Sequence, residues 1–434
     1  MILRDCLLCE LEPVSVERGD LRVVGDAIVE RGPKLTPERG EDLFNLDGAV
    51  VLPGLVNAHT HLYSALARGM PSPERAPTSF ADMLDLVWWR LDRALDTSGV
   101  LASALVGAHE AALCGTTTLI DHHASPNAIH GSLREVGAAL RALGLRGAVA
   151  YEATDRLGAE GLDAGVAEND RAMAERTPQL AALVGGHASF TLSEASLKKL
   201  ADTAKRHATG VHVHAAESVD DVSDAKRRGN SGVMQRFSLA GVLGPKTVLA
   251  HGVHLTDAEI ALARESGSWL VHCSRSNQNN GVGTARASLF GSRAALGTDG
   301  IGADMLTELR SAFFRSQETA TPLSPAQAVA LLAGGHRLST ELFGRPVGPL
   351  KPGAVADLAI YDYAPPTPLT TATLTGHLLY GLSTAHVRDV LVAGRWIVER
   401  KKHVAWASDK IAQIGQEASS RLWANLAEPM SSLL

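Results

Sequence analysis

The chain has 434 residues, and its 47 acidic and 41 basic side chains give a net charge of −6. This length allows one large barrel domain with appendages, or two to three domains of average size. Because the charges are nearly balanced and no Lys/Arg-rich run is present, nucleic acid and anionic membranes are not expected partners. The N-terminus lacks the pattern of a secretory signal and no apolar run has membrane-spanning length, so we expect a soluble cytoplasmic protein.

Residues 1–52 form a first β-rich piece, which includes the segment DLRVVGDAIVERG. It contains Cys6 and Cys9, two of only four cysteines, a number too small for a disulfide framework. This CxxC pair lies in a strand and turn pattern, whereas redox pairs open a helix. Residues three apart on a strand face opposite sides, so we expect both cysteines to be packing thiols.

Eight apolar, β-rich runs follow in the barrel region, residues 53–346, and the first of them begins a few residues earlier. Each run ends in polar residues before a helix-like stretch. Alternating β and α segments predict a parallel sheet, and eight such units predict an α/β fold of the (β/α)8 TIM-barrel type. The runs are AVVLPGLVNAH to His59, TTTLIDHH to His123, RGAVAYEAT to Thr154, AALVGGHASF to Phe190, TGVHVHAAE to Glu217, KTVLAHGVH to His254, SWLVHCSRS to Ser276 and AALGTDG to Gly300.

The connection between the first two runs is long. Residues 62–100 contain a Pro-rich opening and then an apolar helix pattern with Trp88 and Trp89. Long connections in compact domains are often covers or binding loops, so we expect residues 70–95 to lie over the barrel mouth. The alternative is that each Trp simply packs the helix onto the barrel.

Residues 347–405 form a second β-rich piece, with the segments GPLKPGAVADLAIYDY and VRDVLVAGRWIVERKKH. Neither this piece nor residues 1–52 can bury a core by itself. We therefore expect them to pair into a small β-sandwich domain built from both chain ends. Residues 406–434 predict a C-terminal helix.

Histidines lie where several of these strands end. His59 and His61 are two apart and so share one face of a strand, as do His212 and His214. Such a pair alone fits a metal site and ordinary polar strand ends equally well. The carboxyl ends of barrel strands carry the catalytic residues of this fold, however, and almost every one of the eight runs carries a His, Asp or Glu near its end.

Strands one, five and eight bring complementary ligand types to this end of the barrel. Asp299 ends the eighth run, and it would meet His59, His61 and a histidine of the fifth run, His212 or His214, if the barrel closes. Three imidazoles and one carboxylate suit Zn²⁺, Fe²⁺ or Mn²⁺ and leave room for a water molecule. We therefore predict a divalent metal site at this end of the barrel.

The segments PGLVNAHTHLYSALARG, HVHAAE, LAHGVHL, HCSRSN and LGTDG together resemble the amidohydrolase superfamily, in the subtype of chlorohydrolases and aminoheterocycle deaminases. The terminal segment GPLKPGAVADLAIYD resembles the small β-sandwich of that family, and the likeness covers about residues 1–400. Within that family, the segments WWRLDRAL, DHHASP and LGTDGIGADM indicate a closer resemblance to the SsnA group of aminohydrolases.

The resemblance implies a role for individual residues. His59, His61, His214 and Asp299 match the metal ligands, and Asp299 would also act on the attacking water. The resemblance further implies a mononuclear centre, because no strand-four Lys is placed to bridge two metals.

Catalytic and substrate-binding roles are implied in the same way. Glu217, three residues after His214, matches the proton shuttle, and His251 matches the residue that polarises the reacting group. His187 matches a histidine that contacts substrate in some members. Further substrate-contact candidates are Arg68, Arg275 and Asn277.

Two departures from the family pattern bear on the substrate. Several purine and pterin deaminases carry Gln where this chain has Ser64, which we include among the substrate-contact candidates. Members that act on nucleosides carry Glu and Trp after a Phe in the covering segment, whereas residues 80–83 read FADM. Both departures argue against a simple purine-nucleoside assignment.

The ligand pattern and this resemblance together imply a metal-dependent hydrolase of C–N bonds other than peptide bonds, with zinc as the first choice of metal and iron or manganese as alternatives. Hydrolytic deamination of an amino-substituted heterocycle related to purines, pterins, pyrimidines or triazines is the preferred reaction. A ring-opening hydrolase of cyclic amides on the same metal centre is the alternative enzyme, and a non-catalytic metabolite-binding protein is the alternative of another class. We also expect a homo-oligomer, dimeric or larger.

Overall fold

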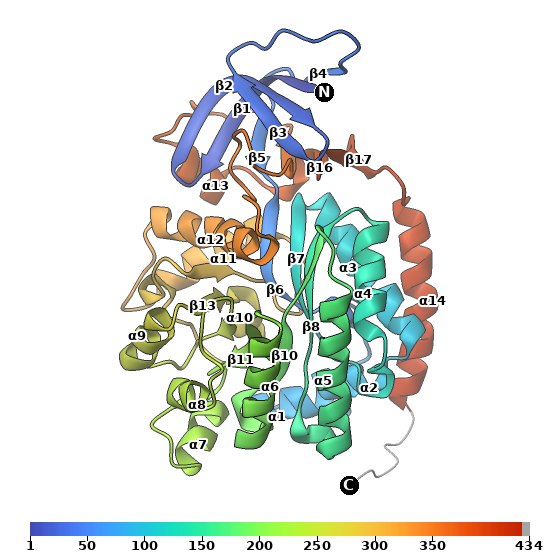
Figure 1. The fold of residues 1–434 in the computed structure, drawn as a ribbon, viewed down its shortest axis with the longest axis vertical. Helices are drawn as coiled ribbons and strands as arrows, with labels where there is room; N and C mark the ends of the chain where they lie inside the picture. The colour runs from blue at the N-terminus through green and yellow to red at the C-terminus, as the bar shows by residue number, and fades with distance from the viewer. Residues whose placement is uncertain (428–434) are drawn as a thin grey trace.

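The computed structural model describes residues 1–427. Helices surround a barrel of parallel strands, and a sheet built from both chain ends covers one end of that barrel (Figure 1). This architecture confirms the predicted TIM barrel with a small β domain. The C-terminal segment forms α14 (Ser408–Ala427), and the rest of the predicted terminal helix, residues 428–434, lies outside the described residues.

Among the described residues 1–427, the eight predicted runs form nine barrel strands, because the fourth run is divided into β9 and β10. Parallel pairing runs from β6 to β9 and from β10 to β14. Bridges between Ala153 and Gly186 and between Thr60 and Asp299 join these two halves and close the barrel. The strands are β6 (Leu55–Thr60), β7 (Thr116–His123), β8 (Arg146–Tyr151), β9 (Leu180–Ala182), β10 (Val184–Ala188), β11 (Val211–Ala215), β12 (Val248–His251), β13 (Trp269–His272) and β14 (Ala294–Leu296).

Helices between and after these strands pack on the outside of the barrel. Capping side chains define where some of these helices begin. Thr256 and Glu259 form a capping box at one helix start, and Ser324 and Gln327 form another. The helices are α3 (Thr97–Leu113), α4 (Ser132–Ala142), α5 (Gly158–Ala174), α6 (Glu194–Arg206), α7 (Val219–Arg227), α8 (Val233–Leu239), α9 (Asp257–Glu265), α10 (Ser274–Asn279), α11 (Met305–Ser316) and α12 (Pro325–Phe343).

The small β domain is a nine-stranded sheet in which β5 pairs with β15, so that Val51 lies opposite Ile360. Cys6 and Cys9 are buried here, and burial raises the pKa of each thiol to about 12, as expected of packing thiols. The elements are β1 (Ile2–Leu11), β2 (Val14–Val24), β3 (Ala27–Gly32), β4 (Leu43–Asn45), β5 (Val50–Pro53), β15 (Leu358–Tyr361), β16 (Val387–Val392), β17 (Arg395–Glu399), β18 (Lys402–His403) and the helix α13 (Leu374–Tyr380).

A buried ion pair joins the barrel to the small β domain. Nε of Arg146, at the start of β8, lies 2.8 Å from Oδ2 of Asp357, just before β15. Oδ1 of Asp357 also accepts a hydrogen bond from the backbone nitrogen of Ala393, at 2.7 Å. The carboxylate of Asp357 therefore binds the guanidinium of the barrel residue Arg146 and a backbone N–H of the small β domain at the same time.

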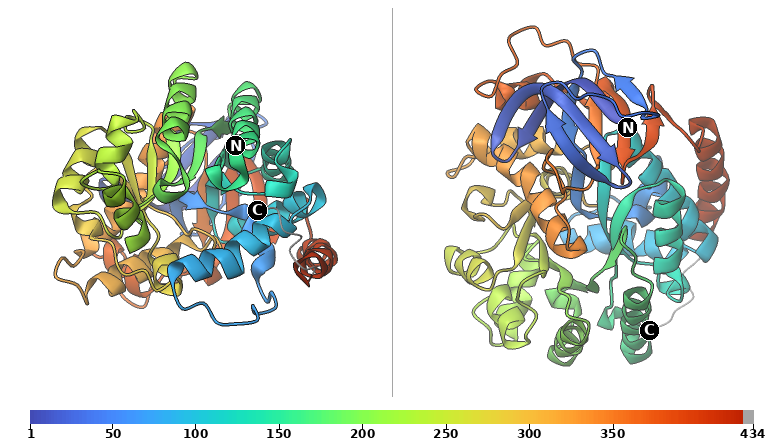
Figure 2. Two further views of the ribbon diagram at one scale, coloured as in Figure 1. Left: turned by 90° about the horizontal axis from the view of Figure 1, so that it is seen from below. Right: turned by 45° about the horizontal axis from the view of Figure 1, so that its top comes forward.

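The long first connection forms a covering segment of three short helical pieces: α1 (Phe80–Met83), a π-helical turn (Leu84–Trp88) and α2 (Trp89–Ala94). Seen from below, this segment lies across the end of the barrel opposite the small sheet (Figure 2). Helix α14 supports it from the side, because the side-chain amide of Asn425 donates to the carbonyl of Ala94 at 3.1 Å. Across the described part of the chain, no helix has both the length and the apolar character to cross a membrane.

Candidate functional site

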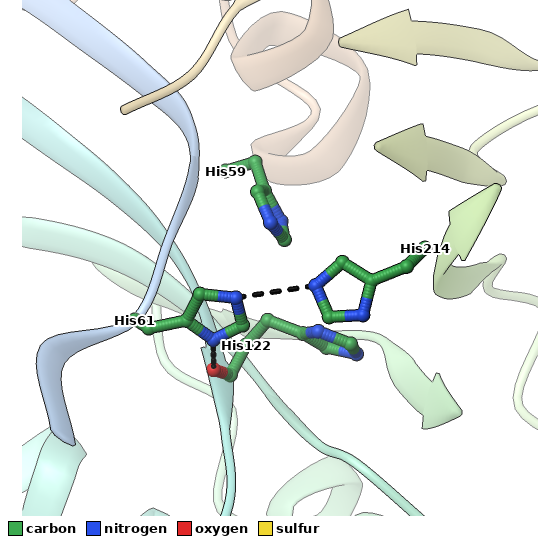
Figure 3. A group of neighbouring side chains, drawn as sticks. All are labelled: His59, His61, His122 and His214. Carbon is green, nitrogen blue, oxygen red and sulfur yellow. Dashed lines mark hydrogen bonds between the residues drawn. The ribbon is translucent and has the colours of Figure 1, made fainter. Parts of the chain in front are cut away.

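The ends of β6, β11 and β14 bring three histidines and one aspartate together inside the barrel. Oδ1 of Asp299 lies 3.1 Å from Nε2 of His59 and 2.8 Å from Nε2 of His61. Nε2 of His61 also lies 3.2 Å from Nε2 of His214, and Figure 3 shows the imidazoles pointing toward one another. The four residues that the family resemblance predicts as ligands therefore lie next to one another, and His122 and His251 lie beside them.

Hydrogen bonds behind these imidazoles fix their orientation. Nδ1 of His61 donates to the backbone oxygen of His122 at 2.5 Å, and Nδ1 of His214 donates to that of His187 at 2.9 Å. Nδ1 of His59 shares a hydrogen with Nε2 of His212 at 2.8 Å. With a hydrogen on Nδ1, a neutral imidazole presents the lone pair of Nε2, the form that binds a metal.

The charges at this point favour a cation. Burial opposes protonation of His61, but the negative charge of Asp299 outweighs it and raises the pKa of His61 to about 10. Burial acts on Asp299 in the opposite sense, and the charge of His61 holds the pKa of that carboxyl well below its usual range. Burial lowers the pKa of His59 to about 3. The carboxylate thus holds positive charge among the histidines.

Backbone strain gathers at the same strand ends. Asp299 has a φ of 54°, His251 a φ of 74° and Ala216, next to Glu217, a φ of 50°. Non-glycine residues adopt this left-handed region only when the surrounding structure holds them there, and such residues cluster at active sites.

Glu217 and His251 face each other beside this cluster. Oε2 of Glu217 lies 3.5 Å from Nε2 of His251, and Oε1 accepts a hydrogen bond from the side-chain amide of Asn280 at 3.2 Å. Burial raises the pKa of Glu217. The arrangement places a carboxyl group of elevated pKa next to an imidazole, as acid–base catalysis requires.

A pocket of about 560 Å³, measured with its open mouth, leads from the surface to this cluster. His61, His214, Glu217 and Asp299 line its inner end. Residues of the covering segment line it as well, which confirms that residues 70–95 lie over the site: they are Phe80, Leu84, Trp88, Trp89 and Asp92.

The structure brings some of the predicted substrate contacts to the pocket. Ser64 lines it, and its hydroxyl donates to the backbone oxygens of His61 and Gly300 at 2.8 and 3.0 Å. His187 lines it too, with Nδ1 held 2.8 Å from the hydroxyl of Thr191. Both residues are therefore in position to contact a ligand.

Three other candidates have different surroundings. Arg68 is exposed and pairs with Glu110 at 2.5 Å, while Arg275 pairs with the buried Glu308 at 2.5 Å. Asn277 lies behind His251, and its Oδ1 accepts a hydrogen bond from Nδ1 of that imidazole at 2.9 Å. Asn277 therefore orients His251 in this structure, and neighbouring Asn280 lines the pocket.

Sequence reasoning missed three buried residues of the site. His122, in β7, lies among the imidazoles, and Glu152, directly after β8, lines the pocket. Both follow the rule of polar residues at strand ends, which therefore could have found them. Asp92 lines the pocket from α2, where no spacing signal marks it.

Comparisons of the sequence with known proteins agree with this geometry. The model of the amidohydrolase family matches residues 50–397. The 5-methylthioadenosine/S-adenosylhomocysteine deaminase of Pelotomaculum thermopropionicum is 29% identical over 93% of this chain and 94% of that protein. The 5'-deoxyadenosine deaminase of Methanosarcina mazei is 26% identical over 98% of this chain and 99% of that protein.

Solved structures share the fold. An adenosine deaminase from Xanthomonas campestris with bound zinc has a TM-score of 0.84 at 22% identity, over 98% of both chains. Atrazine chlorohydrolase from Arthrobacter aurescens, complexed with zinc, has a TM-score of 0.83 at 22% identity, over 96% of this chain and 99% of that one. Sequence identity this low establishes the fold alone.

Proposed function

The chain belongs to the amidohydrolase family, and from that premise we propose that it is a metal-dependent deaminase that hydrolyses an amino group from an N-heterocycle. One observation carries the proposal. Asp299 meets His59 and His61 at hydrogen-bond distance, and the buried Glu217 lines the same pocket. A ligand cluster beside an acid–base residue is what hydrolytic deamination needs.

We assign His59, His61, His214 and Asp299 as the ligands of one divalent ion per chain. Zinc is the first choice, supported by the zinc in both solved neighbours, and iron and manganese are the alternatives. The site fits such an ion because its Nε2 atoms face inward and a carboxylate lies among them. His122 offers another combination with the three histidines, but only Asp299 adds a negative charge that offsets that of the cation.

The residues of the chain then have distinct roles. A divalent ion held here would act as a Lewis acid and would make water nucleophilic near neutral pH. Asp299 orients that water and accepts its proton. Glu217 transfers a proton to the ring nitrogen, takes up the proton of the added hydroxyl group and passes it to the leaving amine, and its raised pKa suits this role. The proton held by Asp299 then returns to Glu217, so both protons of the water are accounted for. His251 stabilises the charge that develops at the attacked carbon.

The pocket supports an aromatic substrate. Trp88, Trp89 and Phe80 line it, and flat rings stack well on such side chains. The two relatives named for deamination of adenosine derivatives support testing purines and their nucleosides first. Ser64 and the sequence FADM at residues 80–83 argue for including free bases, pterins, pyrimidines and triazines in the same set.

The test is a screen for ammonia release across these compound classes, with the metal-loaded wild-type protein and its Glu217→Gln variant. Proton transfer by a positioned side chain contributes roughly 10²–10⁴-fold, so the variant should lose at least ~100-fold in turnover while its metal content stays unchanged. Turnover of the variant at the wild-type rate would remove Glu217 from the mechanism. Loss of metal together with activity would instead make Glu217 a ligand.

Product analysis separates the rival reactions. Deamination releases ammonia, whereas ring opening gives a product with the mass of substrate plus water. The residues needed for catalysis are all present, which argues against a binding protein without activity. A cytoplasmic location and a homo-oligomeric state, dimeric or larger, remain part of this proposal.

A further inference from the structure

Glu152 is a buried carboxylate in the pocket wall that the proposed mechanism does not use. It directly follows β8, and its backbone nitrogen donates to the carbonyl of His123 at 2.8 Å. Its side chain is 6% exposed and lines the pocket together with His187 and His214. A carboxylate oxygen of Glu152 lies within 4.8 Å of a ring nitrogen of His214, so a ring bound at the cluster has an edge within its reach.

One oxygen of the Glu152 carboxylate, Oε1, receives no hydrogen bond from the described part of the protein. Oε1 lies 3.3 Å from Nδ1 of His61 and 3.3 Å from Nδ1 of His122. The hydrogen of His61 Nδ1 points to the carbonyl of His122, and the imidazole of His122 is not oriented to form a hydrogen bond with Oε1. Oε1 is accordingly buried without a hydrogen-bond partner in the described part of the chain. An acceptor in this condition is costly to bury unless a ligand donates to it.

The surrounding wall has the same character. Oδ1 of Asp92 is also buried and lacks a hydrogen-bond partner among residues 1–427, while Oδ2 of Asp92 pairs with Arg156 at 2.5 Å. The lining contains four carboxylates, those of Asp92, Glu152, Glu217 and Asp299, and the side chains that line this described pocket include neither Lys nor Arg. Such a wall attracts N–H donors and cations and repels anions.

We propose that Glu152 is a specificity residue, which accepts hydrogen bonds from amino N–H groups on the edge of the bound ring. The inference rests on the proposed function and narrows it. The substrate class becomes neutral or cationic heterocycles with at least one amino group besides the one that reacts.

Two other roles for Glu152 give different results. A purely structural carboxylate would hold His122, and its loss would lower stability or metal content without changing which rings bind. A ligand of a second cation, together with His187 and His214, would raise the metal content above one ion per chain. Both alternatives can be measured separately from ring recognition.

The experiment compares rings that differ only by replacement of amino groups with methyl groups of the same size. The probes are 2,4-diaminopyrimidine against 2,4-dimethylpyrimidine, and melamine against 2,4,6-trimethyl-1,3,5-triazine. Calorimetric titration measures their dissociation constants with metal-loaded protein that carries Glu217→Gln, so that turnover does not interfere. The same protein is then compared with added Glu152→Gln, with added Glu152→Met, and with added Glu168→Gln as the control.

Glu168 is a matched control because it is a buried carboxylate of α5 that binds the backbone nitrogens of Gly131 and Leu133, outside the pocket. Hydrogen bonds to a charged group are worth enough to give the amino ring at least a ~10-fold preference over its methyl counterpart. We expect this preference in the parent and in the Glu168→Gln protein. In both Glu152 variants it should fall below ~3-fold, with one metal ion retained per chain.

An unchanged preference in the Glu152 variants would overturn the inference, as would a parent protein that binds neither amino probe or binds both members of each pair equally. A content near two metal ions that falls on substitution of Glu152 would also overturn it in favour of the ligand role. A different measurement tests the proposed function. If the wild type released no ammonia, deamination would be wrong, but the binding preference for amino rings could still be observed.

Discussion

Asn277 and His251 lie 26 positions apart in the sequence, yet Oδ1 of Asn277 accepts a hydrogen bond from Nδ1 of His251 at 2.9 Å. This bond turns Nε2 of His251 toward Glu217, 3.5 Å away. His251 also has a positive φ, so its orientation depends on this support. Asn277 therefore acts on the chemistry through the imidazole.

Substitution of Asn277 should separate positioning from substrate binding. We expect Asn277→Ala to lower kcat by ~10–100-fold, the usual cost of losing a group that orients an active-site histidine, with little change in KM. Asn277→Asp keeps the acceptor and should recover most of the rate. Asn279→Ala, on the exposed face of α10, is the control. A rise in KM with unchanged kcat would mean that Asn277 contacts the substrate.

Metal content is the second prediction. Elemental analysis should find one transition-metal ion per chain in the wild type. His61→Ala should lose the metal, because Nε2 of His61 lies beside both Asp299 and His214. His123→Gln is the control, since that buried imidazole bonds to Ser125 and lies outside the assigned ligand set. Normal metal binding by His61→Ala would exclude His61 as a ligand.

The ion pair of Arg146 and Asp357 gives a third prediction. Both side chains are buried, at 3% and 0% exposure, so removing one leaves the other charged and unpaired. Asp357→Ala should therefore lower the free energy of unfolding by ~3–5 kcal/mol. The double variant Arg146→Met/Asp357→Leu should lose less than the single one. Urea unfolding measures the free energy of unfolding of the single and the double variant. A double variant that loses as much stability as Asp357→Ala, or more, would contradict the prediction.

Acid stability depends on His272, which is buried at the end of β13. Burial lowers the pKa of His272 to about 4. Between pH ~4 and ~6.5 the unfolded chain binds this proton and the folded protein does not, so stability rises with pH across that interval. His272→Gln should reduce the slope by up to ~1.4 kcal/mol per pH unit near pH 5. Urea unfolding at several pH values would reveal equal slopes if the prediction is wrong.

The contact of α14 with the first connection supports a fifth prediction. The indole nitrogen of Trp423 donates to the carbonyl of Leu66 at 3.3 Å, close to the start of the covering segment. Trp423→Ala should loosen that segment and raise KM several-fold with a smaller effect on metal content. Trp396→Ala, in β17 of the small sheet, is a matched Trp control. Equal KM values for the two variants would count against support by α14.

Sequence patterns predicted the barrel because each strand ends where an apolar run meets polar residues. They also placed the ends of strands one, five and eight near one another, since a closed barrel gathers its strand ends, and the family resemblance selected His59, His61, His214 and Asp299 among the residues there. Contacts across strands were beyond these patterns. Which imidazole of the adjacent pair His122 and His123 points inward depends on the register between β7 and β8.

Side-chain partners were equally hidden. Asn277 was expected at the substrate, but its side chain bonds to His251, and Asn280, three residues later, lines the pocket. Arg275 was also a candidate, and the carboxylate of Glu308, from α11, binds it instead. Partners of this kind come from elements distant in sequence, which no local pattern encodes.

The pairing of β5 with β15 means that the small sheet cannot be completed until late in translation. Pro53 lies opposite Leu358, so the buried strand Val50–Pro53 leaves the ribosome long before its neighbour. At ~5–20 residues per second, translation takes on the order of 15–60 s to cover that interval. During this time β5 can pair with β1 on one side only, and its other side is an unpaired apolar edge, the kind of edge that recruits other chains. The growing polypeptide therefore needs protection of this edge until about five sixths of the protein has been made.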